Sequence, residues 1–342
     1  MKQVPATTNP YGLITDSQYL TSQAAIEALW QQAEMGDFNA CDGAQLHYRR
    51  WPNPVSDDAI VIVTGRAESV VKYREVIYNF YQQGFSIYSY DHRGQGFSKR
   101  LHDDPHLGHV ERFADYVADL KHFYKGFVAP RQHRHTFMLA HSMGGAVATL
   151  YLEQYPTDFT AAALSAPLHW PDLGRFGTWG EILVELIDLG ARLLRRPANY
   201  ALTQSPFQPQ RFREGDPTTL THSRERFEET QRLFQEHRQI QLGGVSNRWL
   251  AETCRACRRL RRNAHHIAVP ILVLQAEVDC AVTAQGQNRF CQALTKAGTN
   301  LCHHGKPMVI EGAYHELLME TDRYRLPVLN AILDFFNEQK TN

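Results

Sequence analysis

The fold is decided by a run near the middle of the chain, Phe137-Met138-Leu139-Ala140-His141-Ser142-Met143-Gly144-Gly145-Ala146. An apolar, strand-like segment ends at Ser142, and small residues follow it into a helix-like segment. The pattern is small-x-Ser-x-Gly, with Ala140 at the position where Gly is commonest. Residues two before and two after the serine must be small, because strand and helix backbones nearly touch at this turn. We therefore predict a nucleophile elbow at Ser142; the alternative is a buried serine in an ordinary strand–turn–helix.

The composition is typical of a folded protein with a substantial core. Of the 342 residues, 43% are hydrophobic and 21% are charged. Lys plus Arg equals Asp plus Glu, at 36 each, so nothing in the net charge favours nucleic acid as a partner. Residues 1–9 are polar, and no stretch approaches the ~18 apolar residues of a membrane span. From this we expect a cytoplasmic protein.

The cysteines predict neither a disulfide framework nor a metal site. Six of them are scattered along the chain, as is usual for reduced thiols of a cytosolic protein. Cys254-x-x-Cys257 has no second CxxC partner, and the nearby His265 and His266 have the wrong spacing for a zinc knuckle. We therefore predict no metal site at these residues.

Strand-like and helix-like segments alternate along most of the chain. We expect strands over 44–51, 58–64, 85–90, the run before Ser142, 160–165, 270–274 and 308–311, and helices over 22–32, 70–83, 113–128, 146–154, 284–296 and 322–337. This alternation predicts an α/β fold with a mostly parallel central sheet flanked by helices. It stops between 167 and 266, where only helices are expected. We predict an extension over 1–40, a core over 41–166 and 267–342, and a helical lid over 167–266, inserted after the sixth strand.

A nucleophilic serine needs a base, and the base needs an acid that orients it. With an elbow nucleophile these follow in the order Ser, acid, His, on loops after later strands. Asp279 follows the strand expected over 270–274 and is our candidate acid, with Glu277 as the alternative. His315 follows the last expected strand, in Gly312-Ala313-Tyr314-His315, and is our candidate base.

The oxyanion of an acyl-transfer intermediate needs preorganised N–H donors. We expect one from the Met143 backbone, just after the nucleophile, and one from the Arg66 backbone in Thr64-Gly65-Arg66-Ala67-Glu68. The Arg66 guanidinium is also a candidate contact for an anionic group of the substrate. The alternative for this side chain is an ion pair with Glu68 or Asp91.

These motifs, together with Asp91-His92-Arg93-Gly94-Gln95-Gly96-Phe97-Ser98, resemble the α/β-hydrolase branch that contains monoacylglycerol lipases and serine aminopeptidase-like hydrolases. Within that branch the chain is most similar to bacterial lysophospholipases, and the insert segment Leu220-Thr221-His222-Ser223-Arg224 shares the likeness. Two positions depart from the lipases: Thr64 replaces a His, and Arg66 replaces a small residue. The resemblance covers about residues 40–340 and implies no cofactor.

The resemblance implies a lysophospholipase with a single-chain lipid substrate, and the alternatives are a monoacylglycerol lipase, a carboxylesterase or a non-catalytic binding protein. Besides Arg66, we take His141 and Arg224 as candidate substrate contacts. The segment 182–194 has an apolar face that packs on the domain below or meets a membrane. The Arg-rich segment 254–266 is either a solvated face that pairs with acids or a basic surface for anionic lipid headgroups. Peripheral membrane contact is thus a second expectation, while the oligomeric state is not indicated.

Overall fold

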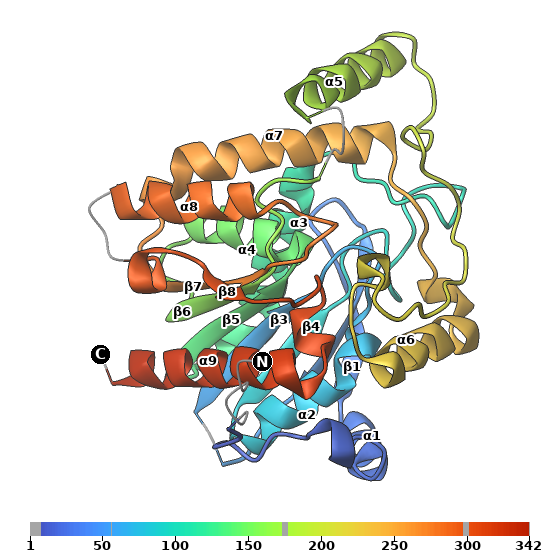
Figure 1. Cartoon of the computed structure of the whole chain (residues 1–342). Coiled ribbons are helices and arrows are strands. Elements are labelled where there is room, and N and C mark those ends of the chain that lie inside the picture. Colours follow the sequence, from blue (N-terminus) through green and yellow to red (C-terminus); the bar gives the residue numbers. More distant parts are fainter. Residues whose placement is uncertain (1–7, 56, 173–176, 297–300, 342) are drawn as a thin grey trace.

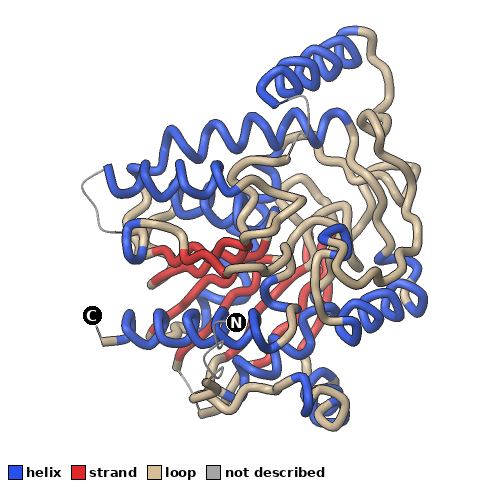
Figure 2. The backbone as a smooth tube through the Cα atoms, viewed as in Figure 1, coloured by secondary structure: helices blue, strands red, loops and turns tan. Residues whose placement is uncertain are grey.

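The computed structural model describes residues 8–55, 57–172, 177–296 and 301–341. An eight-stranded sheet runs through the molecule (Figures 1 and 2). In spatial order its strands are β1 (Glu34–Asn39), β2 (Gln45–Trp51), β4 (Ser86–Tyr90), β3 (Asp58–Val63), β5 (His135–His141), β6 (Ala161–Ser165), β7 (Ile271–Ala276) and β8 (Met308–Ile310). β2 is antiparallel to both of its neighbours, and all the other pairs are parallel. The predicted fold class, a mostly parallel sheet, is confirmed.

Helices cover both faces of this sheet. One face carries α3 (Phe113–Phe123), α4 (Met143–Gln154) and α8 (Ala284–Lys296), with α7 (Asn247–Asn263) packed on these helices. The other face carries α2 (Arg74–Gln82) and α9 (Asp322–Lys340), with α1 (Gln23–Trp30) packed on α2. Val61 and Val63 of β3 point into the first core and Ile60 and Ile62 into the second, because successive strand residues face opposite sides. Strands buried on both faces explain the continuous apolar runs of the sequence.

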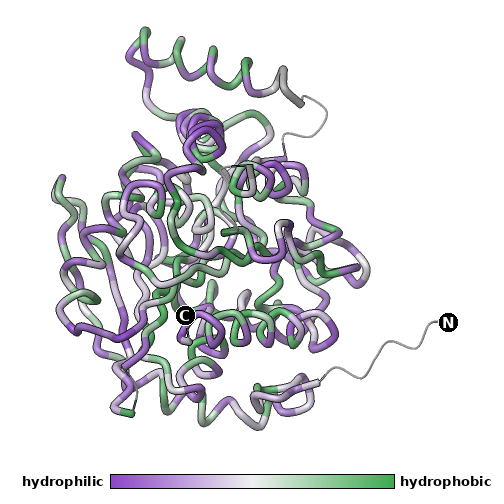
Figure 3. The backbone as a smooth tube through the Cα atoms, turned by 90° about the vertical axis from the view of Figure 1, so that its left-hand side faces the viewer, coloured by the Kyte–Doolittle hydropathy of each residue, from purple (hydrophilic) through white to green (hydrophobic). Residues whose placement is uncertain are grey.

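The segment between β6 and β7 is helical in the part that the structure describes. It contains α5 (Gly177–Leu193), α6 (Arg224–Glu236) and α7. α7 lies on the helical layer of the core, to which it contributes Trp249 and Leu260. α5 contacts α7 and is the outermost element of the molecule, which Figure 3 shows clearly. The boundaries 167 and 266 of the lid remain a prediction.

β1 was not expected from the sequence. It lies within the predicted extension 1–40 and pairs with β2, from Glu34 opposite Arg50 to Asn39 opposite Gln45. Phe38 is the residue of β1 that is buried. β1, at the end of the predicted extension, is therefore an edge strand of the main sheet.

Candidate active site

Ser142 lies at a strained turn between β5 and α4. Its φ is 51° and its ψ is −120°, a conformation that residues with a side chain rarely adopt. A Cβ on Gly144 would lie 2.2 Å from the Val63 carbonyl oxygen, so the first turn of α4 touches the end of β3. Ala140 is fully buried. The turn has the geometry that the sequence predicted, and the small residues stand where the backbones meet.

The two partners predicted for the serine lie beside it. His315 Nε2 is 2.9 Å from Ser142 Oγ, and His315 Nδ1 is 2.7 Å from Asp279 Oδ2. Asp279 Oδ1 accepts the backbone N–H groups of Ala281 and Val282 at 2.8 and 3.0 Å. These bonds hold the carboxylate in place, so the structure forms an ordered series from Asp279 through His315 to Ser142.

The pKa shifts of His315 and Asp279 indicate the charge of each residue. Burial lowers the pKa of His315, but the hydrogen bond and charge of Asp279, with the charges of Glu316 and Glu68, outweigh it and raise the pKa overall. Burial raises the pKa of Asp279, but the hydrogen bond and charge of His315 outweigh it and lower the pKa overall. An ionised Asp279 fixes a proton on Nδ1 and leaves Nε2 of neutral His315 as the acceptor for the Ser142 proton.

Two backbone amides are available beside Ser142. Met143 is the first residue of α4, so its N–H has no partner within the helix. Gly65 donates its N–H to Glu68 and Ala67 donates to Gln95, whereas the Arg66 N–H between them has no acceptor among the described residues. Because β3 and β5 are paired up to Val63 and Ala140, both amides lie just past the same sheet edge. The geometry suits an oxyanion hole.

A cavity of about 380 Å³ adjoins this edge, between Arg66 and the segment that joins β6 to β7. Arg66 Nη1 donates to the Gly243 carbonyl oxygen at 2.8 Å, and no carboxylate of the described residues forms an ion pair with Arg66. The expected alternative, an ion pair with Glu68 or Asp91, is therefore wrong. Burial lowers the pKa of Arg66, although the neighbouring Tyr116 opposes the shift. The apolar part of the lining is formed by Pro206, Phe207, Leu220, Phe227, Phe234, Leu242 and Met319.

Comparison with known proteins shows to which family the chain belongs. The family described as "Serine aminopeptidase, S33" matches residues 55–322. The chain belongs to this family. It is 37% identical to "Lysophospholipase L2" of Escherichia coli K12, over 91% of this chain and 90% of the relative. It is 32% identical to "Probable lysophospholipase L2" of Haemophilus influenzae, over 86% and 89%.

Solved structures confirm the α/β-hydrolase fold. A soluble variant of monoglyceride lipase from Saccharomyces cerevisiae superimposes with a TM-score of 0.68 at 18% identity, covering 90% of this chain and 96% of the other. A carboxyl esterase from Bacillus coagulans gives the same TM-score at 17% identity, with coverages of 90% and 99%. The resemblance inferred from the sequence motifs to the α/β-hydrolase branch and its bacterial lysophospholipases is thus confirmed.

The other two residues predicted to contact the substrate, His141 and Arg224, differ in their exposure to solvent. His141 is buried behind Ser142, with Nδ1 3.1 Å from the Ser165 carbonyl oxygen and its ring 4.9 Å from that of His315. Arg224 lies on the surface at the start of α6, where it pairs with Glu228. The structure brings His141 to the triad and leaves Arg224 outside the cavity lining.

The segment between β6 and β7, which is the predicted lid, is hydrogen-bonded to the loop that carries His315. The Glu316 N–H donates to the Leu220 carbonyl oxygen at 2.9 Å. The fully buried Glu320 carboxylate accepts the backbone N–H groups of His222 and Tyr314 and lies 2.8 Å from His222 Nδ1. The sequence did not indicate this contact, because about a hundred residues separate the two segments.

Proposed function

We propose that this protein is a cytoplasmic lysophospholipase that cleaves the acyl ester of a lysophospholipid through an acyl-enzyme on Ser142. The observation that carries the proposal is the hydrogen-bonded series Ser142–His315–Asp279. The names of the relatives that are 37% and 32% identical support the choice of substrate. The six free thiols suit a reducing compartment.

In this mechanism Ser142 Oγ attacks the ester carbonyl carbon while His315 Nε2 accepts its proton. His315 then returns that proton to the glycerol oxygen as it leaves, and Asp279 stabilises the imidazolium formed between the two steps. Water, deprotonated by the same His315, attacks the acyl-enzyme and releases the fatty acid. The Met143 and Arg66 amides donate hydrogen bonds to the oxyanion in both halves of the reaction.

Arg66 is the residue that we assign to the phosphate of the substrate. Among the cations lining the cavity, Lys72 and Arg226 are held in ion pairs with carboxylates, whereas Arg66 has only the Gly243 carbonyl. A guanidinium that is partly buried without a counterion favours an anionic ligand. A lysophospholipid carries its phosphate on the same glycerol as the ester, so one residue contacts both groups, through its amide and its side chain.

The test is a hydrolysis panel of lysophospholipids, monoglycerides, p-nitrophenyl esters and aminoacyl amides. We expect the highest kcat/KM with a lysophospholipid, and Arg66→Ala to lower the lysophospholipid-to-monoglyceride ratio of kcat/KM about tenfold or more. The substitution also removes the bond between Arg66 and Gly243, but that loss affects both substrates and therefore does not change the ratio. An unchanged ratio with better monoglyceride turnover would favour a monoacylglycerol lipase. Failure of a fluorophosphonate probe to label Ser142 would favour a binding protein.

We further propose that α5 rests on an anionic membrane surface. Its acidic residues Glu181, Glu185 and Asp188 pair with arginines of α7, which turns its apolar residues outward. Leu186 and Leu193 are 61% and 76% exposed. Arg192, Arg195 and Arg196 at the end of the helix, and Arg259 and Arg262 on α7, are exposed and add positive charge. Among the described residues, every helix is too short or too polar to cross a bilayer.

Co-sedimentation with vesicles tests this contact. We expect binding to vesicles that contain anionic lipid, weaker binding to neutral vesicles, and loss of binding in Leu186→Asp/Leu193→Asp. Leu202, also highly exposed but outside α5, provides the matched control Leu202→Asp. The membrane proposal is wrong if the wild-type protein does not bind vesicles and instead forms dimers that the double variant abolishes. In that case a second copy of the chain covers this face.

A further inference from the structure

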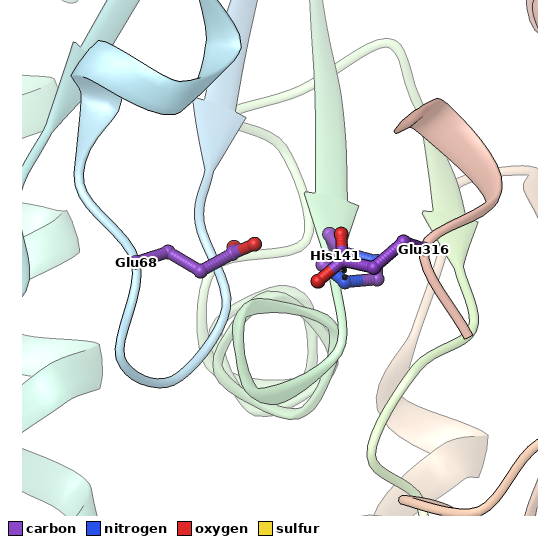
Figure 4. Close-up of side chains that lie close together, drawn as sticks. All are labelled: Glu68, His141 and Glu316. Atoms are coloured by element: carbon purple, nitrogen blue, oxygen red, sulfur yellow. Dashed lines mark ion pairs between the residues drawn. The ribbon is translucent and has the colours of Figure 1, made fainter. Parts of the chain in front are cut away.

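A buried ion cluster connects the three loops of the site. Lys72 Nζ lies 2.5 Å from Glu68 Oε1 and 2.6 Å from Glu316 Oε1. Glu316 Oε2 is 3.5 Å from His141 Nε2. Figure 4 shows Glu68, His141 and Glu316 converging from the loop after β3, the end of β5 and the loop after β8. All four side chains are at most 12% exposed.

Two carboxylates and an imidazole within 4.8 Å of one another are also a possible metal-ligand set. Lys72 already bridges both carboxylates, so its ammonium supplies the positive charge that a metal ion would bring. The chemistry of the set therefore points to an internal ion cluster.

Each carboxylate of the cluster is tied to a part of the catalytic machinery. Glu68 Oε2 accepts the N–H of Gly65 at 2.5 Å and the hydroxyl of Tyr73 at 2.6 Å, which fixes the loop that presents the Arg66 amide. Glu316 directly follows His315. Burial opposes ionisation of Glu68, but the charge of Lys72 and the hydrogen bonds from Lys72 and Tyr73 outweigh it and lower its pKa, so it is a carboxylate. Lys72 has a raised pKa and is charged.

We propose that Glu68, Lys72 and Glu316 are positioning residues that hold the oxyanion loop against the histidine loop and leave a net charge of −1 behind His315. Two carboxylates attract the imidazolium that forms when Ser142 loses its proton, and one ammonium cancels half of that charge. The inference rests on the proposed serine-hydrolase mechanism. It adds residues that the series Ser142–His315–Asp279 does not contain.

The groups that face His315 determine the sign of the effect. Asp279 comes from the loop after β7, Glu68 and Lys72 from the loop and helix after β3, His141 from β5, and Glu316 from the loop of His315 itself. Burial lowers the pKa of His141, which keeps that ring neutral. Removing either cluster carboxylate takes a negative charge from His315, lowers the pKa of this base and moves the acid limb of kcat/KM to lower pH.

The experiment measures kcat/KM against pH with a soluble p-nitrophenyl ester. We expect Glu316→Gln and Glu68→Gln each to shift the acid limb downward by about one pH unit. Both glutamines keep an oxygen that accepts hydrogen bonds, so the shapes of the loops are retained. Glu311→Gln, at an exposed position four residues before His315, is the matched control and leaves the limb unchanged. Lys72→Arg retains activity, whereas Lys72→Met loses at least tenfold.

Two readouts separate this inference from the mechanism on which it rests. If a fluorophosphonate probe labels Ser142 and the acid limb does not move in Glu316→Gln or Glu68→Gln, the cluster is only structural and the inference is overturned. If Ser142 of wild type is not labelled, the proposed mechanism fails and the inference with it. Chelator treatment leaves the pH profile unchanged, and an altered profile would assign the cluster to a metal instead.

Discussion

Glu277 Oε2 accepts a hydrogen bond from the Gly312 backbone N–H at 2.7 Å, across the gap between the loops that follow β7 and β8. Two residues farther along the first loop, Asp279 bonds the ring of His315. The two acids of this loop therefore have different partners. Glu277 holds the backbone of the histidine loop, and Asp279 holds the imidazole.

This division predicts unequal effects of two matched substitutions. Asp279→Asn should lower kcat by about four orders of magnitude, because an amide favours the wrong tautomer of His315. Glu277→Gln keeps an oxygen for Gly312 and should lower kcat less than tenfold. Steady-state kinetics on one ester compares them. Similar losses in both variants would mean that the assignment of the acid is wrong.

The raised pKa of His315 predicts the pH dependence of wild-type activity. The base must be neutral, so kcat/KM should rise with pH through the pKa of His315, with a midpoint above the ordinary value of about 6.5. The shift has the sign expected for a histidine with a carboxylate partner. A stopped assay between pH 5 and 9 gives the midpoint, and a value below 6.5 would contradict the electrostatic description of the site.

Gly144 predicts a strict size limit at the elbow. A Cβ at this position would lie 2.2 Å from the Val63 carbonyl oxygen, a backbone atom that cannot rotate away. Gly144→Ala should therefore separate α4 from β3, move the Met143 amide, and cost about 1–3 kcal/mol of unfolding free energy together with most of the activity. Gly126→Ala is the control, because a Cβ there meets no atom within 4 Å. Denaturant unfolding and kcat check both variants.

The ion pairs of Arg226, on α6, should contribute to the free energy of unfolding. Its guanidinium bonds both oxygens of Glu75 at 2.8 and 3.0 Å and Asp16 at 2.6 Å, and only 3% of the side chain is exposed. Arg226→Met removes this bidentate pair but leaves Glu75 paired with Arg325 at 2.8 Å, so it should cost about 1.5–3 kcal/mol.

Arg232 on the same helix provides the comparison. It pairs with Glu229 and Glu236, but half of its side chain is exposed. Arg232→Met should cost about 0–1 kcal/mol. Equal stabilities of the two variants in urea unfolding would show that the buried pair does not anchor the helix.

The hydrogen-bonded series Ser142–His315–Asp279 was predictable from the sequence because each member follows a strand with a strong local signal. Buried parallel strands appear as apolar runs, and their carboxyl ends meet at one sheet edge. The order Ser142, Asp279, His315 then suffices to bring the residues together. β1 was missed for the opposite reason: Glu34-Met35-Gly36-Asp37-Phe38-Asn39 buries only Phe38, and most of its residues are not typical of strands.

Long-range ion pairs could not be predicted in the same way. Lys72 and Glu316 are 244 residues apart, and no local pattern pairs them. The sequence indicated that α5 is amphipathic, but not which face would contact α7. The acidic face of α5 contacts α7, because α7 carries arginines opposite the acidic residues. Of the two interpretations of that Arg-rich segment, ion pairing holds for Arg255 and Arg258.

The bonds between Glu320 and both His222 and Tyr314 have a consequence for recombining members of this family. A lid transplanted with crossovers at 167 and 266 would bring a foreign residue 222 to a native residue 320, or leave a buried carboxylate short of donors. Working chimeras should therefore exchange the lid together with the segment from Gly312 to Glu320. The part of the chain that must be exchanged as a whole therefore consists of two segments that are distant in the sequence.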